Sequence, residues 1–293
     1  MAFKDLLLSL TTYPDPTARS AVEAAVGYAA LLEARITTVA LEIEIPMPLG
    51  FYADALVDLS GLVVAEREKS VRHARDLIEA FTTEAGRRRV PHDMLVSPAN
   101  TARTPVLIRD HARLRDLTIL PLGPSPDYRN VVAETVTFEA GRPVLVIPEA
   151  AAPRPALDHI VVAWDFGRSA ARALADALPL LRRAGHVGLV TVETGTDIET
   201  TRSADDLRHH LDRHGIAATF ETIEAGDRTV GAALADHALD AGADLLVMGA
   251  CLRPLATARR PCRCSCRIRA GLRPLWGRQT ADSLHRRSAY GRS

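Results

Sequence analysis

Short apolar runs alternate with longer amphipathic segments along the first 250 residues of the chain. Runs such as FKDLLLSL and LTILPL are typical of buried strands. In a longer segment, Val71, Ala74, Ile78 and Phe81 fall on one face of a helix, which predicts an amphipathic helix. The first half of the chain therefore predicts strands at residues 3–10, 36–45, 92–96, 117–122 and 144–147, and helices at 17–33, 60–85, 104–112 and 131–140.

The second half repeats this order after a linker, EAAAPRPALD, that is rich in Pro and Ala. It predicts strands at 159–163, 187–192, 219–223 and 245–248, and helices that begin at Ser169, Asp205 and Thr229. Strands joined by helical crossovers form parallel sheets with helices on both faces. We therefore expect an α/β protein with two tandem doubly wound parallel-sheet domains. Their expected bounds are residues 1–150 for the first domain, 151–250 for a truncated second domain and 251–293 for a disordered tail.

Charge and cysteine usage narrow the function classes. The chain has 36 basic and 36 acidic residues, so no net field attracts nucleic acid or an anionic membrane. No apolar stretch is long enough to span a bilayer. All four Cys residues lie at or after position 251, so no disulfides hold the predicted domains. We expect a cytoplasmic protein that binds neither nucleic acid nor membrane.

Ligands of a doubly wound sheet bind beyond the carboxyl ends of the strands, where the strand order reverses. In the second half, AWDFGRS and VMGA stand at these ends, and in the first half SLTTYPD and LPLGPSP do. Asp165 is therefore a candidate ligand for the adenine or ribose of a nucleotide. The same aspartate is equally suited to a local role, because Asp side chains often cap the turn before a helix.

Three segments resemble the universal stress protein family: IVVAWDFGRSAARALADALPLL, ADHALDAGADLLVMGA and VVAETVTFEAGRPVLVIPE. They are similar to the opening strand and Ser-capped helix, the third helix with the fourth strand, and the closing helix and strand of that domain. Over about residues 1–250, the chain resembles a tandem, UspA-like member. The resemblance implies an adenine nucleotide alpha hydrolase-like fold, a role in stress responses, and pairing of the domains within the chain or in a homodimer.

ATP-binding members of that family place an aspartate near the adenine and wrap the phosphates with a glycine loop after the fourth strand. By this resemblance, Asp165 takes the aspartate position and Val192 supplies the backbone partner of the adenine. Met248, Gly249 and Ala250 open the glycine loop, whose remainder is absent. ATP binding is thus expected to be weak or lost, and the chain is expected to act by binding or signalling, not as an enzyme. A ligand-free structural or dimerisation protein and a weak ATPase are the alternatives.

The first half departs further from the family pattern. Thr11 and Thr12 follow its first strand, with no aspartate there. Pro124 and Pro126 follow its fourth strand and remove two backbone N–H groups that a phosphate would need. We expect the first domain to be a non-binding copy.

The character of the chain changes after Ala250. Residues 251–293 hold eleven Arg and one acidic residue, Asp282. Codons permitted for residues 252–259, read one base later, encode Tyr-Gly-His-Ser-Arg-Leu-Arg, which is how a family member would continue. Our hypothesis is that the reading frame slips near Cys251, which the coding DNA would test. A metal site at Cys262, Cys264 and Cys266 and a nucleic-acid-binding tail are less favoured alternatives, because the spacing lacks the C-x2-C pair of zinc sites and no nucleic-acid-binding module is recognisable.

Overall fold

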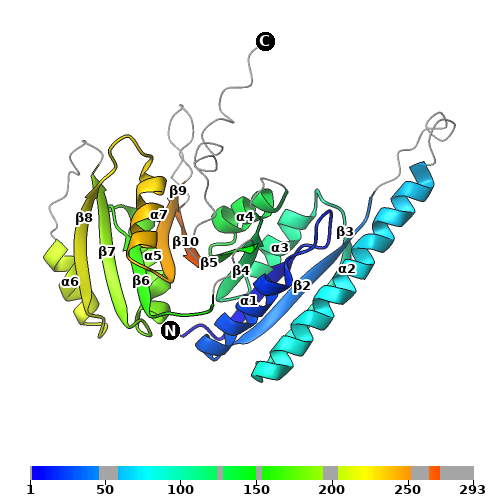
Figure 1. Ribbon diagram of the computed structural model, residues 1–293, viewed down its shortest axis with the longest axis horizontal. Coiled ribbons are helices and arrows are strands. Elements are labelled where there is room, and N and C mark those ends of the chain that lie inside the picture. The colour runs from blue at the N-terminus through cyan, green and yellow to red at the C-terminus, as the bar shows by residue number, and fades with distance from the viewer. Residues whose placement is uncertain are drawn as a thin grey trace, which may run out of the picture. The chain divides into compact units, whose positions relative to one another are not determined.

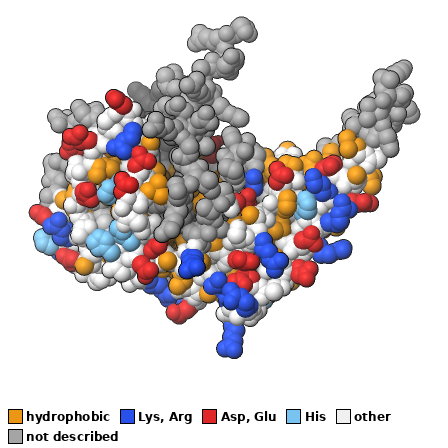
Figure 2. All heavy atoms as spheres, in the orientation of Figure 1, with side chains coloured by type: hydrophobic (Ala, Val, Ile, Leu, Met, Phe, Trp, Pro, Cys, Tyr) orange, Lys and Arg blue, Asp and Glu red, His pale blue; other side chains and the backbone are white. Residues whose placement is uncertain are grey.

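The computed structural model describes residues 2–45, 59–123, 128–149, 154–193, 204–251 and 264–270. The chain divides into two compact units, Met1–Pro155 and Ala156–Ser293. The boundary lies within the segment that is rich in Pro and Ala. Among the described residues, no helix has the length and apolar character needed to cross a membrane. Figure 2 shows basic and acidic side chains interspersed on the face of unit 1 that it draws.

Unit 1 is a five-stranded parallel sheet with two helices on each face. The sheet order is β3-β2-β1-β4-β5, so the order reverses between β1 and β4. Its strands are β1 (Asp5–Leu10), β2 (Arg35–Ile43), β3 (His92–Ala99), β4 (Leu117–Leu122) and β5 (Val144–Pro148), and its helices are α1 (Arg19–Leu32), α2 (Leu59–Arg88), α3 (Thr104–Ala112) and α4 (Tyr128–Glu139). The predicted doubly wound parallel sheet is therefore confirmed.

The helices of unit 1 cover the sheet in pairs. Helices α1 and α2 pack together on one face, as Figure 1 shows, and α3 packs against α4. Leu6, Leu7 and Leu8 of β1 are all fully buried, because helices cover both faces of this central strand. That double burial is why the strand reads as a continuous apolar run and not as an alternating one. On the α3–α4 side, Leu7 and Val39 pack in a cluster with Ile108 and Val136.

Unit 2 repeats the strand order of unit 1. Its four parallel strands run in the order β9-β6-β7-β8, which matches β4-β1-β2-β3. The strands are β6 (His159–Ala163), β7 (His186–Glu193), β8 (Ala218–Glu224) and β9 (Leu245–Cys251), and the helices are α5 (Arg168–Leu181), α6 (Ala204–Asp212) and α7 (Val230–Asp240). Val161 and Leu246 pack with Leu234 of α7 in the core.

The tail contains a strand that the sequence analysis did not predict. Cys264–Ala270 form β10, which pairs antiparallel with β9 from Cys264↔Cys251 to Ala270↔Leu245. The expectation of disorder is wrong for these seven residues. The sequence CSCRIRA alternates apolar and polar positions, which is the period of a strand, and the edge of β9 offers unpaired backbone groups. The other tail residues, including those of the frame-slip hypothesis, lie outside the described residues.

Candidate functional site

The strand order of unit 2 reverses between β6 and β9, and the predicted site residues lie at the carboxyl end of this pair. Asp165 is exposed and follows β6 by two residues. Its Oδ1 accepts a hydrogen bond from the backbone N–H of Gly167 at 2.8 Å, and Phe166 between them has a left-handed φ of 57°. Asp165 therefore forms the tight turn that leads from β6 into α5. The local role considered from the sequence is present in the structure.

Helix α5 begins at Arg168, so its N-cap lies two residues before Ser169. Its N-cap is Gly167, with no side-chain cap, so the expectation that Ser169 caps the helix is wrong. The Asp165 side chain already holds the Gly167 N–H, and this bond places the chain in a helical path before Ser169 is reached. Ser169 lies instead in the first turn of α5, where it meets β9.

The predicted glycine, Gly249, lies inside strand β9 and not in a turn. An ideal Cβ on Gly249 would lie 2.5 Å from the carbonyl carbon of Ser169 and 2.8 Å from the backbone N of Ala170. Any other residue here would push the first turn of α5 off the sheet. Met248 and Ala250 flank Gly249 in the same strand, and all three are partly buried. Glycine thus allows the helix N-terminus to sit directly on β9.

Val192 lies near the carboxyl end of β7, partly buried and paired with Ile223 of β8. The backbone O of Val190 accepts a hydrogen bond from Trp164 N at 2.8 Å, so the backbone N–H and C=O of Val190 point toward β6. Backbone groups in a parallel ladder alternate between the two neighbours, so the N–H and C=O of Val192 also face the β6 side. There they lie past Ala163, the last residue of β6.

Trp164 connects β6 to this end of β7. Its backbone O accepts a hydrogen bond from Thr191 Oγ1 at 2.8 Å, and its ring makes an edge contact with Phe166 at a centroid distance of 5.8 Å. The indole Nε1 is buried and has no hydrogen-bond partner within the part of the chain that the structure describes. A buried donor of this kind costs free energy unless an acceptor reaches it. The sequence analysis did not single out Trp164, although its position beside Asp165 was a usable signal.

Register relates the same positions of unit 1 to those of unit 2. Leu6 pairs with Leu117 as Ile160 pairs with Leu245, so Thr11 takes the place of Asp165. Pro121 lies four residues after Leu117, as Gly249 lies four residues after Leu245, so Pro121 takes the place of Gly249. Thr11 does not form an equivalent turn: its N–H donates to Thr17 Oγ1 at 2.9 Å, and its O accepts from Thr17 N at 2.9 Å.

Side chains of α2 occupy the carboxyl end of β1 and β2. Ser70 Oγ lies 2.8 Å from Thr12 Oγ1 and accepts from Ile43 N at 2.9 Å, while Thr12 Oγ1 donates to Leu41 O. His73 Nδ1 lies 2.9 Å from Thr12 O and must carry the proton of that bond, because a carbonyl oxygen can only accept. Thr12 and Ser70 are almost fully buried. This network fills the edge that corresponds to the Asp165–Val192 edge of unit 2.

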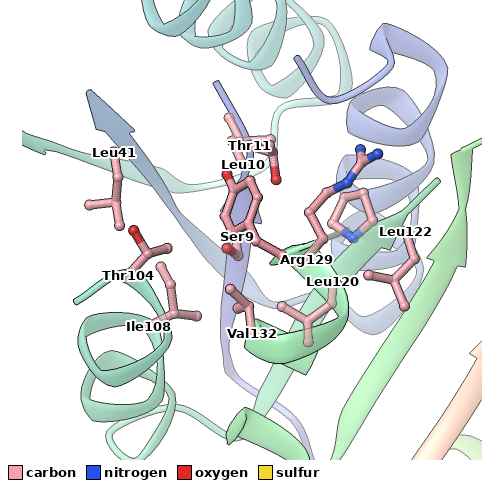
Figure 3. Close-up of a pocket in the computed structure, with 12 residues that line it drawn as sticks. Ser9, Leu10, Thr11, Leu41, Thr104, Ile108, Leu120, Leu122, Arg129 and Val132 are labelled. Carbon is pink, nitrogen blue, oxygen red and sulfur yellow. The ribbon is translucent and has the colours of Figure 1, made fainter. Parts of the chain in front are cut away.

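A small pocket lies beside this network, at the ends of β1 and β4. Figure 3 shows residues from β1, α3 and α4 converging on it, with Arg129 extending away from Ile108 and Val132. Its volume of about 20 Å³ is room for one water molecule. Arg129 is buried and forms an ion pair with Glu149 at 2.8 Å. Neither residue was singled out from the sequence.

The described residues contain no group of three or more His, Cys, Asp or Glu side chains that could hold a metal ion. The side chains of Cys262, Cys264 and Cys266 lie outside the described set, so the metal alternative for the tail stays a prediction.

Comparison with known proteins relates this geometry to one fold. No family model matches the chain, and none of the curated proteins matches it. Among solved structures, it is similar to a universal stress protein from Archaeoglobus fulgidus DSM 4304, with 13% sequence identity and a TM-score of 0.57 over 83% of this chain and 84% of that chain. At this level of identity the likeness shows the fold. The chain therefore has the α/β fold of a universal stress protein.

Proposed function

We propose that this chain is a tandem universal stress protein that acts by binding or signalling, with a degenerate adenine-nucleotide site in unit 2. The observation that carries the proposal is the contrast between equivalent edges of the two units. In unit 2, the exposed Asp165 turn leads into a helix seated on Gly249. In unit 1, buried side chains fill the same edge.

The adenine side of the unit 2 site fits the ligand by its chemistry. The N–H and C=O of Val192 face the space past β6 and suit the donor and acceptor edge of an adenine ring. The buried indole N–H of Trp164 is a donor that lacks an acceptor among the described residues. Asp165 Oδ1 holds the turn, so the carboxylate would contact a ligand while also keeping α5 in place.

The part of the unit 2 site that would hold the phosphates fits ATP less well than the adenine side does. Strand β9 continues through Cys251 and pairs with β10 along its whole length. A backbone in a ladder cannot at the same time wrap its N–H groups around a phosphate as a glycine loop does. In a binding module of this kind, the presence or absence of bound ATP would be the signal. We therefore propose weak binding without turnover, and a non-binding unit 1.

The experiment is a titration of fluorescent ATP against the chain, against D165A, and against a version whose residues from 252 on are restored to the shifted frame. We expect weak binding by the chain, tighter binding by the restored protein, and a loss of binding in D165A. T11A, at the equivalent place in unit 1, is the matched control and should bind as the parent does. The absence of ATP binding in every variant would favour a ligand-free structural protein, and release of phosphate would favour a weak ATPase.

We further propose that the protein is cytoplasmic, does not bind nucleic acid, and pairs its domains within the chain or in a homodimer. Light scattering on the purified chain would separate a monomer from a homodimer. Electrophoretic mobility of labelled RNA or DNA in its presence would expose a contribution of the Arg-rich tail.

A further inference from the structure

Two histidines lie side by side at the amino end of the unit 2 sheet. His159 begins β6 and His186 begins β7, and the two residues are register partners in this parallel pair. Their rings make an edge contact with a centroid distance of 4.7 Å. His186 is exposed and His159 is partly exposed, and Figure 2 shows histidine side chains gathered on the surface of unit 2. Imidazole nitrogen is a preferred ligand of divalent nickel, copper and zinc.

Hydrogen bonds fix which nitrogen of each neutral ring carries the proton. Nδ1 of His159 lies 3.0 Å from the backbone O of Ala241, which can only accept, so Nδ1 holds the proton and Nε2 keeps its lone pair. Thr219 Oγ1 donates its one proton to Val187 O at 3.5 Å and therefore accepts from Nε2 of His186 at 3.4 Å. Nδ1 of His186 is then the nitrogen with the lone pair. Metal-bound histidines have this arrangement, with one nitrogen on the metal and the other hydrogen-bonded to the protein.

The backbone holds both histidines in place. The N–H of His186 donates to Asp158 O at 2.7 Å, and the N–H of His159 donates to Asp244 Oδ2 at 2.9 Å. An ideal Cβ on Gly188 would lie 3.7 Å from Nε2 of His159, so this nitrogen lies over β7. Residues two apart in a strand share a face, so it lies on the face that also carries His186. The two rings are thus assembled without an ion.

Unit 1 has charged side chains at the equivalent places. Register makes Asp5 and Arg35 the counterparts of the two histidines. Arg35 forms an ion pair with Asp93 at 2.9 Å. A guanidinium has no lone pair to offer a metal. The imidazole pair is therefore a feature of unit 2 that the repeated fold does not require.

A second histidine pair in unit 2 lacks the same preparation. The rings of His210, in α6, and His214, which follows that helix, have a centroid distance of 4.8 Å. Nη2 of Arg182 lies 2.9 Å from Nδ1 of His214, and a guanidinium can only donate, so this nitrogen is already the acceptor of a hydrogen bond. The positive charge of Arg182 would also repel a metal ion. This pair is a matched control for the first.

We propose that His159 and His186 bind one divalent transition-metal ion of the nickel, copper and zinc class through Nε2 and Nδ1, respectively, with water completing its coordination. Two protein ligands make a site of modest affinity, which fills and empties as the concentration of the ion changes. The bound ion joins β6 to β7 and therefore stabilises unit 2. His159 and Asp165 lie at opposite ends of β6, so the proposal does not depend on the nucleotide site.

The test is calorimetric titration of the full chain with Ni²⁺, after alkylation of its thiols with iodoacetamide so that the Cys residues do not compete. We expect the parent to bind Ni²⁺ and to gain melting temperature when it does. H159A and H186A should each weaken binding more than tenfold, and T219V, which removes the hydrogen-bond partner of the His186 ring, should weaken it by about tenfold. H186A changes an exposed side chain and serves alone if H159A does not fold.

Two controls make the result specific. H210A/H214A should bind Ni²⁺ as the parent does. Mg²⁺ at the same concentration should not displace Ni²⁺, because Mg²⁺ takes oxygen ligands. The proposal is overturned if the parent shows no saturable binding, if H186A binds Ni²⁺ as tightly as the parent, if H210A/H214A loses as much affinity as H186A, or if Mg²⁺ displaces the ion.

Discussion

Gly249 and Ser169 bring strand β9 and helix α5 into direct backbone contact, since a Cβ on the glycine would lie 2.5 Å from the carbonyl carbon of the serine. Backbone cannot rotate away as a flexible side chain can. G249A should therefore destabilise unit 2 by about 1–3 kcal/mol, the usual range for overpacking. Urea unfolding followed by tryptophan fluorescence is a suitable measurement, because both Trp residues, Trp164 and Trp276, belong to unit 2.

The control for this substitution is G231A in α7. Nothing lies within 4 Å of an ideal Cβ at Gly231. Alanine there should be neutral or stabilise the unit by up to about 1 kcal/mol, because glycine disfavours helix. Equal losses of stability in the two variants would mean that the contact with Ser169 does not set the requirement for glycine.

Asp244 and Asp116 hold equivalent places in the two units. Oδ2 of Asp244 accepts the N–H groups of Asp158 and His159 at 2.8 and 2.9 Å, and Oδ2 of Asp116 accepts those of Lys4 and Asp5 at 2.8 and 3.1 Å. D244A should cost about 1–3 kcal/mol, because two backbone donors lose a charged acceptor. D116A should cost a similar amount in unit 1.

Asparagine at the same positions tests the cause of that loss. An amide oxygen can accept both N–H groups, so D244N and D116N should retain at least half of the stability that the alanine variants lose. Circular dichroism during urea unfolding reports on both units, and tryptophan fluorescence reports on unit 2. Losses as large in the asparagine variants as in the alanine variants would contradict the hydrogen-bond explanation.

Ser70 is the centre of the buried network that fills the carboxyl end of β1 and β2. S70A leaves the Ile43 N–H without its acceptor and removes a bond to Thr12. We expect a loss of about 1–3 kcal/mol in the free energy of unfolding, the usual penalty for an unsatisfied buried group. T82A is a fair comparison, because the Thr82 hydroxyl donates to carbonyl groups of its own helix, and its removal should cost less than about 1 kcal/mol.

The most predictable elements include one strand with helices on both faces and one short helix. Residues 117–122 and 104–112 were predicted with the bounds that the structure has for β4 and α3. Helix starts were less predictable: the helix predicted from residue 17 begins at Arg19 with Ala18 as its N-cap, and the Thr17 hydroxyl accepts a hydrogen bond from Thr11 N. A cap is decided by tertiary contacts as well as by residue type, and those contacts are not visible in a local pattern.

The candidate site was only partly predictable for a similar reason. Asp165 follows from its position after a strand, whereas Gly249, expected just after the fourth strand, lies inside β9. The pair of Arg129 and Glu149 joins an early helical position to the end of a different strand. Only the wound topology brings both to one edge, so no spacing along the chain indicates their contact. Strand β10 was predictable, because the alternation of apolar and polar residues in CSCRIRA is visible in the sequence.

Glu84 makes the free energy of unfolding of unit 1 fall at low pH. Hydrogen bonds from Arg87, and then from Arg88, lower the pKa of its carboxyl from 4.5 to about 2 against the opposing effect of burial. A carboxyl whose folded pKa is depressed adds stability above the unfolded pKa, and this stability is lost as the pH falls from about 4.5 toward 2. E84Q should therefore lower the free energy of unfolding by about 1–2 kcal/mol at pH 7.

The pH profile distinguishes this charge effect from lost packing. Melting temperatures of the parent and E84Q should differ at pH 7 and approach each other as the pH falls from about 4.5 toward 2, because the parent loses there what the variant already lacks. E68Q, which removes the exposed partner of Arg72, should follow the parent throughout. A constant gap between the parent and E84Q down to pH 3 would mean that Glu84 acts by shape and neutral hydrogen bonding, and that its ion pairs with Arg87 and Arg88 within α2 add nothing to stability.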